Sequence, residues 1–389
     1  MSDERERLIV GVVGAGTMGA GIAQVCLQAG HEVLLHDVDH AAIERGRARI
    51  ADGLGRLVEK GKLTSDDQAG MTAALRDAHT LHEVAQEADI VIEAALEVMD
   101  LKRTIFEALG GGARPDTILA TNTSALSVAE IAGASQAPER VVGLHFFNPA
   151  PLMPLVEVVA PPRADDRVVD RAVRFVEGLG KTPIVCADSP GFIVNRVNRP
   201  FTLEALRMLE AGEAGVEQID QAVQSAGYPM GPLTLMDLVG IDVNLAVATA
   251  LWNGFDQAVR FTPSAIQREL VDSGNLGRKS GQGFYRYENG RPRGLAWDRT
   301  PSGSMTDEEI VRRLELAIIN EAYLCAGEGV ADPVDIDRAM QLGASHPYGP
   351  FERAGQLGLR AVVTGLRALE QTYGDRFQVA PSLWQVASI

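Results

Sequence analysis

The sequence predicts an α/β domain built on a mostly parallel sheet, followed by an all-helical domain that is present in two tandem copies. Short apolar runs alternate with helical stretches up to residue 188, which is typical of a parallel sheet covered by helices. After residue 189 the strand-like runs disappear, and apolar residues recur at three- and four-residue spacing. This helical pattern then recurs at a nearly constant offset, and 389 residues are enough for two or three separate cores.

The first domain is expected over residues 1–188. Its β-rich runs are, in chain order, LIVGVVG, EVLLHD, DIVIEA, TILATN, RVVGLHFF, LVEVV and TPIVCA. Segments of helical periodicity separate these runs, so we expect strands and helices to alternate through the domain.

The second domain is expected over residues 189–288. Segments such as FTLEALRMLEAGE and VEQIDQAVQSAG have the apolar spacing of amphipathic helices. Ser189 and Pro190 predict the start of the first helix, because a serine hydroxyl caps a helix and proline is favoured at its first position. Residues 289–304, NGRPRGLAWDRTPSGS, lack periodicity and are rich in Gly, Pro and Arg, which predicts a linker.

Residues 305–389 are interpreted as a second copy of the helical domain. IVNRVNRPFTLEAL at 193 aligns with IVRRLELAIINEAY at 310, and three further anchors follow at offsets of 117 or 118. They are Ile219 with Ile336, Gly231 with Gly349, and Gly240 with Gly358. Chance matches would not keep this register, so we infer an internal repeat.

Composition excludes several classes of function. With 46% apolar and 23% charged residues the chain is a globular protein, and it has neither an apolar run that could span a bilayer nor the layout of a signal peptide. We therefore expect a cytoplasmic protein. A net charge of −16 disfavours nucleic acid and anionic membranes as partners. Cys26, Cys186 and Cys325 have no metal-ligand or disulfide spacing, so buried reduced thiols are expected and no metal site.

A glycine-rich loop, GVVGAGTMGAGIAQ, lies between the first strand and the first helix. Gly14, Gly16 and Gly19 have the spacing that lets a backbone approach a pyrophosphate, and the next strand ends at Asp37, where an acid would accept a hydrogen bond from a ribose 2′-hydroxyl. We predict a Rossmann-type site that favours NAD over NADP, made by Gly14, Ala15, Gly16, Thr17, Met18, Gly19 and Asp37. Two other interpretations are a glycine turn without a ligand and an FAD site, which the helical second domain fits less well.

The segment HFFNP places His145 at the carboxyl end of a sheet strand, where open α/β sheets bind ligands. Oxidation of an alcohol by NAD needs a base for the hydroxyl proton, and histidine is the usual choice without a metal. Glu157, in the next strand-like run, would contact the imidazole if the turn NPAPLMP folds the two strands alongside each other. An isolated histidine is more often a core residue, but the glutamate and the nearby loop favour a general base held by a carboxylate.

Six motifs, in order, resemble the L-3-hydroxyacyl-CoA dehydrogenase family. They are GVVGAGTMGAGIAQ, TNTSALS, HFFNPAPLMPLVEVV, SPGFIVNR, GPLTLMDLVGID and GRKSGQGFYRY, and the resemblance covers about residues 8 to 287. It implies NAD-dependent oxidation of an L-3-hydroxyacyl-CoA to the 3-ketoacyl-CoA. The two helical copies resemble the multifunctional β-oxidation polypeptides, although no hydratase domain is present.

The resemblance also implies roles for individual residues. His145 would be the base and Glu157 its partner, while Ser124 and Asn195 would contact the substrate beside the reacting group. Cofactor contacts are implied for Glu97, Lys102, Ser124, Asn148 and Lys279.

Coenzyme A requires a positive patch in this acidic chain. Residues 41–62 hold six basic and three acidic side chains, and Lys60 lies nearest the lysine that contacts CoA in the family. Gly53 stands where the family has a serine, which puts that part of the CoA contact in doubt. In the second helical copy Arg312 replaces Asn195, so we expect this copy to lack catalytic residues.

Two other functions stay open at this point. One is a dehydrogenase of a free 3-hydroxy acid such as L-gulonate, and the other is a non-catalytic NAD-binding protein. For assembly we expect either a homodimer or a pseudo-dimer, in which the second helical copy packs on the first within one chain.

Overall fold

The computed structural model describes residues 7–297, 303 and 305–387. The chain forms two compact units. Unit 1 ends at Ser189, and unit 2 begins at Pro190.

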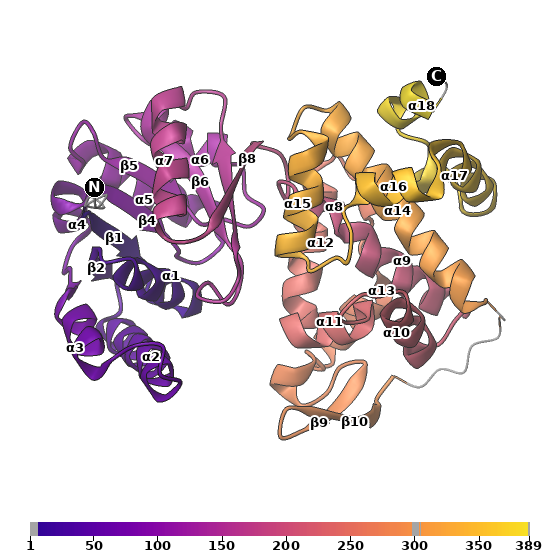
Figure 1. Cartoon of the computed structure of the whole chain (residues 1–389), viewed down its shortest axis with the longest axis horizontal. Helices are drawn as coiled ribbons and strands as arrows, with labels where there is room; N and C mark the ends of the chain where they lie inside the picture. Colours follow the sequence, from indigo (N-terminus) through magenta and orange to yellow (C-terminus); the bar gives the residue numbers. More distant parts are fainter. Residues whose placement is uncertain (1–6, 298–302, 304, 388–389) are drawn as a thin grey trace. The chain divides into compact units, whose positions relative to one another are not determined.

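Unit 1 is a doubly wound α/β domain with an eight-stranded sheet in the order β3-β2-β1-β4-β5-β6-β7-β8 (Figure 1). All neighbouring strands are parallel except β6 and β7, which are antiparallel. The elements are β1 (Ile9–Val13), α1 (Thr17–Gln28), β2 (Glu32–His36), α2 (His40–Glu59), α3 (Ser65–Ala73), β3 (Leu75–Asp77), α4 (Leu81–Glu87), β4 (Ile90–Glu93), α5 (Met99–Gly112), β5 (Ile118–Thr121), α6 (Val128–Ala134), β6 (Val141–Phe146), β7 (Leu155–Ala160), α7 (Asp166–Gly178) and β8 (Thr182–Ala187).

The sheet positions the site at the carboxyl ends of its strands. Strands β4, β5 and β6 are buried along their whole length, because helices cover a parallel sheet on both faces. The chain runs outward from β1 to β3 and then returns to β4 on the other side of β1. Ligands of open α/β sheets bind at such a reversal of strand order.

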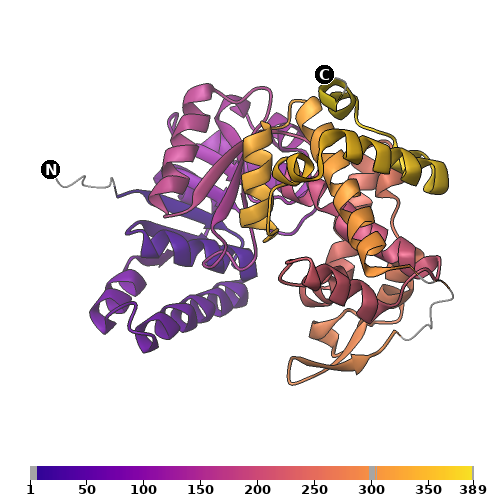
Figure 2. The same cartoon turned by 45° about the vertical axis from the view of Figure 1, so that its right-hand side comes forward.

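Unit 2 is helical, with one hairpin. Its elements are α8 (Val194–Val197), α9 (Arg199–Glu210), α10 (Val216–Ser225), α11 (Pro232–Val239), α12 (Ile241–Gly254), α13 (Ala265–Asp272), β9 (Tyr285–Glu288), β10 (Arg291–Leu295), α14 (Asp307–Gly327), α15 (Pro333–Gly343), α16 (Pro350–Leu357), α17 (Leu359–Tyr373) and α18 (Pro381–Ala387). The long helix α14 packs against α9, α10 and α16. In Figures 1 and 2 the hairpin of β9 and β10 projects from one end of these helices.

Two expectations for this unit are wrong. Ser189 and Pro190 do not begin a helix, because a turn with positive φ at Gly191 and Phe192 comes first and α8 begins at Val194. The expected linker is also not wholly irregular, since residues 291–295 form β10 and pair with β9. Residues 298–302 and 304 of that linker lie outside the described residues.

All three cysteines are buried thiols, and none is in a disulfide. Within the described residues no group of three or more His, Cys, Asp or Glu side chains could hold a metal ion. Over the same part of the chain, no single helix is long and apolar enough to cross a membrane, although α11 and α12 would pass that test together despite a 102° bend between them.

Candidate active site

The glycine-rich loop joins β1 to α1, and each glycine has a steric reason. Gly14 has φ +102°, and a Cβ there would lie 2.6 Å from the Ala94 carbonyl oxygen. At Gly19 a Cβ would lie 1.8 Å from the Gly14 oxygen, so α1 could not pack this close to the loop. A Cβ at Gly16 would have no atom within 4 Å, so the backbone there is open to a ligand. The loop has the form that a pyrophosphate needs.

The carboxylate of Asp37 lies beside this loop at the end of β2. One oxygen accepts a hydrogen bond from the Ala15 backbone N–H at 2.8 Å, and the other accepts from Asp39 N–H at 3.0 Å. Val38 follows it with its apolar side chain 96% exposed. A half-buried carboxylate next to an uncovered apolar surface suits a ribose and its adenine.

His145 and Glu157 form a buried pair across two antiparallel strands. The strands β6 and β7 place the two residues directly opposite each other, as the sequence predicts. His145 Nδ1 and Glu157 Oε2 are 2.6 Å apart, and the side chains are 5% and 0% exposed. Because the carboxylate accepts the Nδ1 proton, Nε2 is the basic nitrogen of the ring. The ring also lies 4.5 Å, centroid to centroid, from Phe147.

Lys181, just before β8, holds the connection between these two strands. Its ammonium donates to the Ala150 and Met153 carbonyl oxygens, each at 2.7 Å. Burial lowers the pKa of Lys181 from its ordinary value. The exposed Asn148 lies in the same connection and precedes a cis proline. Lys181 therefore fixes the segment that follows His145, a role that the sequence does not indicate.

Glu97 organises the loop after β5 that carries Ser124. Glu97 Oε1 accepts hydrogen bonds from the Thr123 hydroxyl at 2.5 Å and from the Ser124 N–H at 2.9 Å. Both Glu97 and Ser124 remain accessible to solvent. The predicted cofactor or substrate residues Glu97 and Ser124 are thus in contact with each other.

Lys102 is completely buried beneath this loop. Its ammonium bonds both oxygens of Glu93, at 2.7 and 2.9 Å, and lies 3.4 Å from Glu97 Oε2. The Thr121 hydroxyl also donates to Glu93, at 2.7 Å. A direct cofactor contact remains a prediction for Lys102, but its observed contacts hold Glu97. Glu93 was not singled out in the sequence, where the only signal is an acid at the end of the apolar run IVIE.

The predicted residues of unit 2 lie on different elements. Asn195 is half-buried in α8. Lys279 is in the turn before β9, and its ammonium bonds Asp242 Oδ2 at 2.7 Å at the start of α12. Asn195 and Lys279 thus lie on separate elements of unit 2.

Acidic side chains pair with some of the basic residues in the expected CoA patch. Arg45 pairs with Asp39 at 3.0 Å and Arg47 with Asp77 at 2.7 Å, whereas Lys60 is exposed at the end of α2. Gly53 faces α1, and a Cβ there would lie 2.1 Å from Gln24 Oε1. A serine at this position would therefore require the end of the Gln24 side chain to move.

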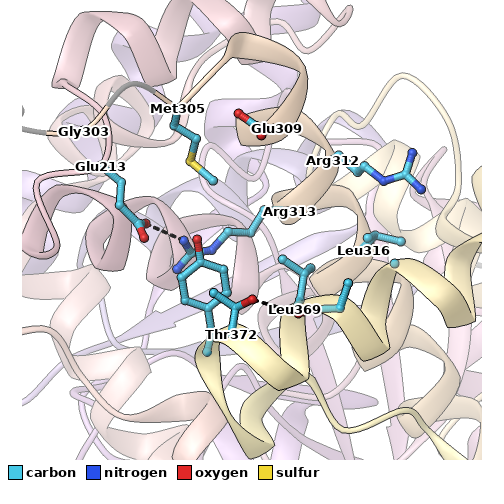
Figure 3. A pocket seen from close by; sticks show the side chains of 12 residues that line it. Glu213, Gly303, Met305, Glu309, Arg312, Arg313, Leu316, Leu369 and Thr372 are labelled. Carbon is cyan, nitrogen blue, oxygen red and sulfur yellow. Dashed lines mark hydrogen bonds and ion pairs between the residues drawn. The ribbon is translucent and has the colours of Figure 1, made fainter.

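A cavity of about 490 Å³ lies in unit 2, between α14 and α17. In Figure 3 the side chains of Met305, Arg313 and Leu316 surround it, and Arg312 lies on the side away from Glu213. Arg312 aligns with Asn195 in the repeat, and the cavity contains none of the predicted catalytic residues.

Known proteins resemble the chain over both units. The family model for the NAD-binding domain of 3-hydroxyacyl-CoA dehydrogenase matches residues 9–189, and that for its C-terminal domain matches residues 191–287 and 310–388. A protein of Escherichia coli named 3-hydroxyadipyl-CoA dehydrogenase is 36% identical over 94% of each chain. A 3-hydroxybutyryl-CoA dehydrogenase of Mycobacterium tuberculosis is 41% identical over 74% of this chain and 100% of its own. The crystal structure of an Escherichia coli 3-hydroxybutyryl-CoA dehydrogenase superposes with a TM-score of 0.91 at 35% identity, covering 98% of both chains.

Proposed function

The chain belongs to the 3-hydroxyacyl-CoA dehydrogenase family, and from its site we propose that it oxidises an L-3-hydroxyacyl-CoA to the 3-ketoacyl-CoA with NAD and with His145 as general base. The observation that carries this proposal is the buried 2.6 Å contact of His145 with Glu157 at the carboxyl end of β6. A base in this position can take a proton from an alcohol while its charged form is stabilised.

His145 removes the hydroxyl proton through Nε2. Glu157 keeps the Nδ1 proton in place and stabilises the positive charge that the ring acquires. No water competes strongly for this charge, because both side chains are at least nine-tenths buried. The backbone around Ser124, which Glu97 holds, would position this serine for contact with the substrate oxygen.

The residues of the glycine-rich loop fit a dinucleotide. The open backbone at Gly16 would admit the pyrophosphate, and Asp37 would accept hydrogen bonds from the ribose. Bound NAD would supply the hydride acceptor. We propose the cofactor contacts of Asn148 and Lys279 on the resemblance alone, and the contact of Lys60 with CoA on its exposed charge.

The test is NADH production with a series of 3-hydroxyacyl-CoA esters, in the parent protein and in His145→Gln. We expect a loss of about 10²- to 10⁴-fold in kcat, which is the usual contribution of a positioned base. Comparison of 3-hydroxybutyrate with its CoA ester distinguishes a dehydrogenase of free hydroxy acids. A protein that binds NAD but turns over none of these substrates would be a non-catalytic relative, and parental turnover in His145→Gln would reject the mechanism.

We also propose that the helical domain is duplicated in unit 2. The two segments matched by the C-terminal family model have the same order of elements, with α9 to α12 corresponding to α14 to α17. Asp220 accepts from the Leu233 N–H at 2.9 Å, and its counterpart Asp337 accepts from the Phe351 N–H at 2.7 Å. Gly240 and its counterpart Gly358 both have positive φ and begin the next helix.

Reciprocal ion pairs support the packing of one copy on the other. Arg196 of the first copy pairs with Glu321 of the second at 2.7 Å. Their counterparts, each 117 residues away, pair in the opposite direction, since Arg313 bonds Glu204 at 2.8 Å. Such exchange of equivalent contacts characterises a two-fold interface. We propose that the second copy takes the place of a partner subunit.

Sedimentation of the full chain tests the pseudo-dimer. We expect the full chain to sediment as a monomer, because the second copy already fills the interface of the first. A stable dimer that requires the exposed faces of α9 or α14 would contradict this arrangement.

A further inference from the structure

Arg199, at the start of α9, is buried without an acid. The residue is 5% exposed. Its Nη1 donates to Asn244 Oδ1 at 3.2 Å, and its Nε has no hydrogen-bond partner. Arg199 forms no ion pair with the described residues. Burial lowers the pKa of Arg199 to about 10, so the side chain is still charged at neutral pH.

The surroundings of Arg199 are polar but uncharged. Asn244 Oδ1 also accepts from Gln267 Nε2 at 2.7 Å, and Gln267 Oε1 has no partner. Both residues are buried. A buried charge without a counterion costs several kcal/mol of stability. The other buried arginines of this unit avoid this cost, since Arg196 and Arg313 each bond a buried glutamate.

Arg199 also has a defined position relative to the predicted substrate residue. It follows Asn195 by four residues, and Asn198 between α8 and α9 keeps a helical conformation. Side chains four residues apart lie on one face, separated by about 6 Å along the helix. The three bonds that join the hydroxyl carbon of a six-carbon acyl chain to its last carbon, at about 1.5 Å each, span roughly 4 Å, which is about 2 Å less than this separation and of the same order of length.

We propose that Arg199 binds a carboxylate at the far end of the acyl chain, so that the preferred substrate is a short 3-hydroxyacyl-CoA with a terminal carboxylate. This inference rests on the proposed function of the same site. The guanidinium offers two parallel N–H donors to a carboxylate, and its Nε is unused in the protein alone. In a chain with a net charge of −16, such a substrate needs a local cation to be admitted.

The experiment compares three substrates in the full chain, namely 3-hydroxybutyryl-CoA, 3-hydroxyhexanoyl-CoA and 3-hydroxyadipyl-CoA. The last two have equal length and differ in the terminal carboxylate. We expect kcat/KM to favour the carboxylate by at least about 100-fold, because a buried charge pair is worth several kcal/mol. In Arg199→Met this preference should disappear, mainly through a higher KM for 3-hydroxyadipyl-CoA, while turnover of 3-hydroxybutyryl-CoA changes less than about threefold.

Two further measurements separate recognition from a structural role. Arg199→Met should keep or raise the thermal midpoint, because it removes an uncompensated buried charge. The matched control Arg268→Met, at an exposed position in α13, should change neither specificity nor stability. Equal turnover of the two six-carbon esters by the parent, or an equal loss on all three substrates in Arg199→Met, would overturn the assignment of Arg199 alone. A parent inactive on all three esters would overturn the proposed function as well.

Discussion

Replacement of Glu157 by glutamine tests how the protein supports its base. Glutamine keeps the size of the side chain and one oxygen acceptor, but it removes the negative charge 2.6 Å from the His145 ring. A hydrogen bond to a charged group is worth about 1.5 to 3 kcal/mol, and each 1.36 kcal/mol of barrier is a factor of ten in rate. We therefore expect kcat to fall roughly 10- to 150-fold, which is less than the loss in His145→Gln.

The assay is the initial rate of NADH formation at saturating substrate and cofactor. The KM for NAD should stay within about twofold of the parent value, because Glu157 lies in β7 and is fully buried, away from the glycine-rich loop. Glu177→Gln, an exposed change in α7, is the control for removal of an acid from the same unit. If a folded Glu157→Gln protein kept its kcat within twofold, the carboxylate would have no part in stabilising the charged base.

The remaining predictions concern the cofactor loop, the segment after His145, the helical interface and acid stability. Gly19→Ala should weaken NAD binding more than about tenfold in a fluorescence titration, because its Cβ would meet a backbone oxygen at 1.8 Å; unchanged affinity would contradict the close packing. Lys181→Met should lower kcat/KM about tenfold, with partial recovery in Lys181→Arg, since two bonds of 2.7 Å are lost. Glu204→Gln should lower the free energy of unfolding by about 3 to 5 kcal/mol in urea titrations, because a buried acid with arginine partners is neutralised; a change below about 0.5 kcal/mol would argue against the ionic interface. Burial lowers the pKa of His346 to about 3, so below about pH 6.5 the unfolded chain takes up a proton that the folded chain does not, and stability falls as pH falls, by up to about 1.4 kcal/mol per unit. In His346→Gln this part of the acid dependence should vanish from urea titrations at several pH values.

Local patterns in the sequence were enough to predict the types of the domains and much of the candidate site. The cofactor loop and Asp37 directly follow their strands, so the spacing of these residues in the sequence was enough to predict their arrangement. The pairing of His145 with Glu157 could be predicted because a short connection forces two successive strands to lie side by side. Helix periodicity likewise separated the α/β unit from the helical unit, although it missed the turn at Gly191 and the strand at 291–295.

Contacts between segments far apart in the chain were decided only by the tertiary structure. Lys181 reaches the connection after His145 from 28 and 31 residues away, and no local pattern marks such a contact. Arg199 reads in sequence as an ordinary basic residue of a helix, and only the packing of α12 and α13 around it reveals a buried charge. The reason is physical: periodicity records which face of an element is apolar, whereas burial and charge pairing depend on which other elements cover that face.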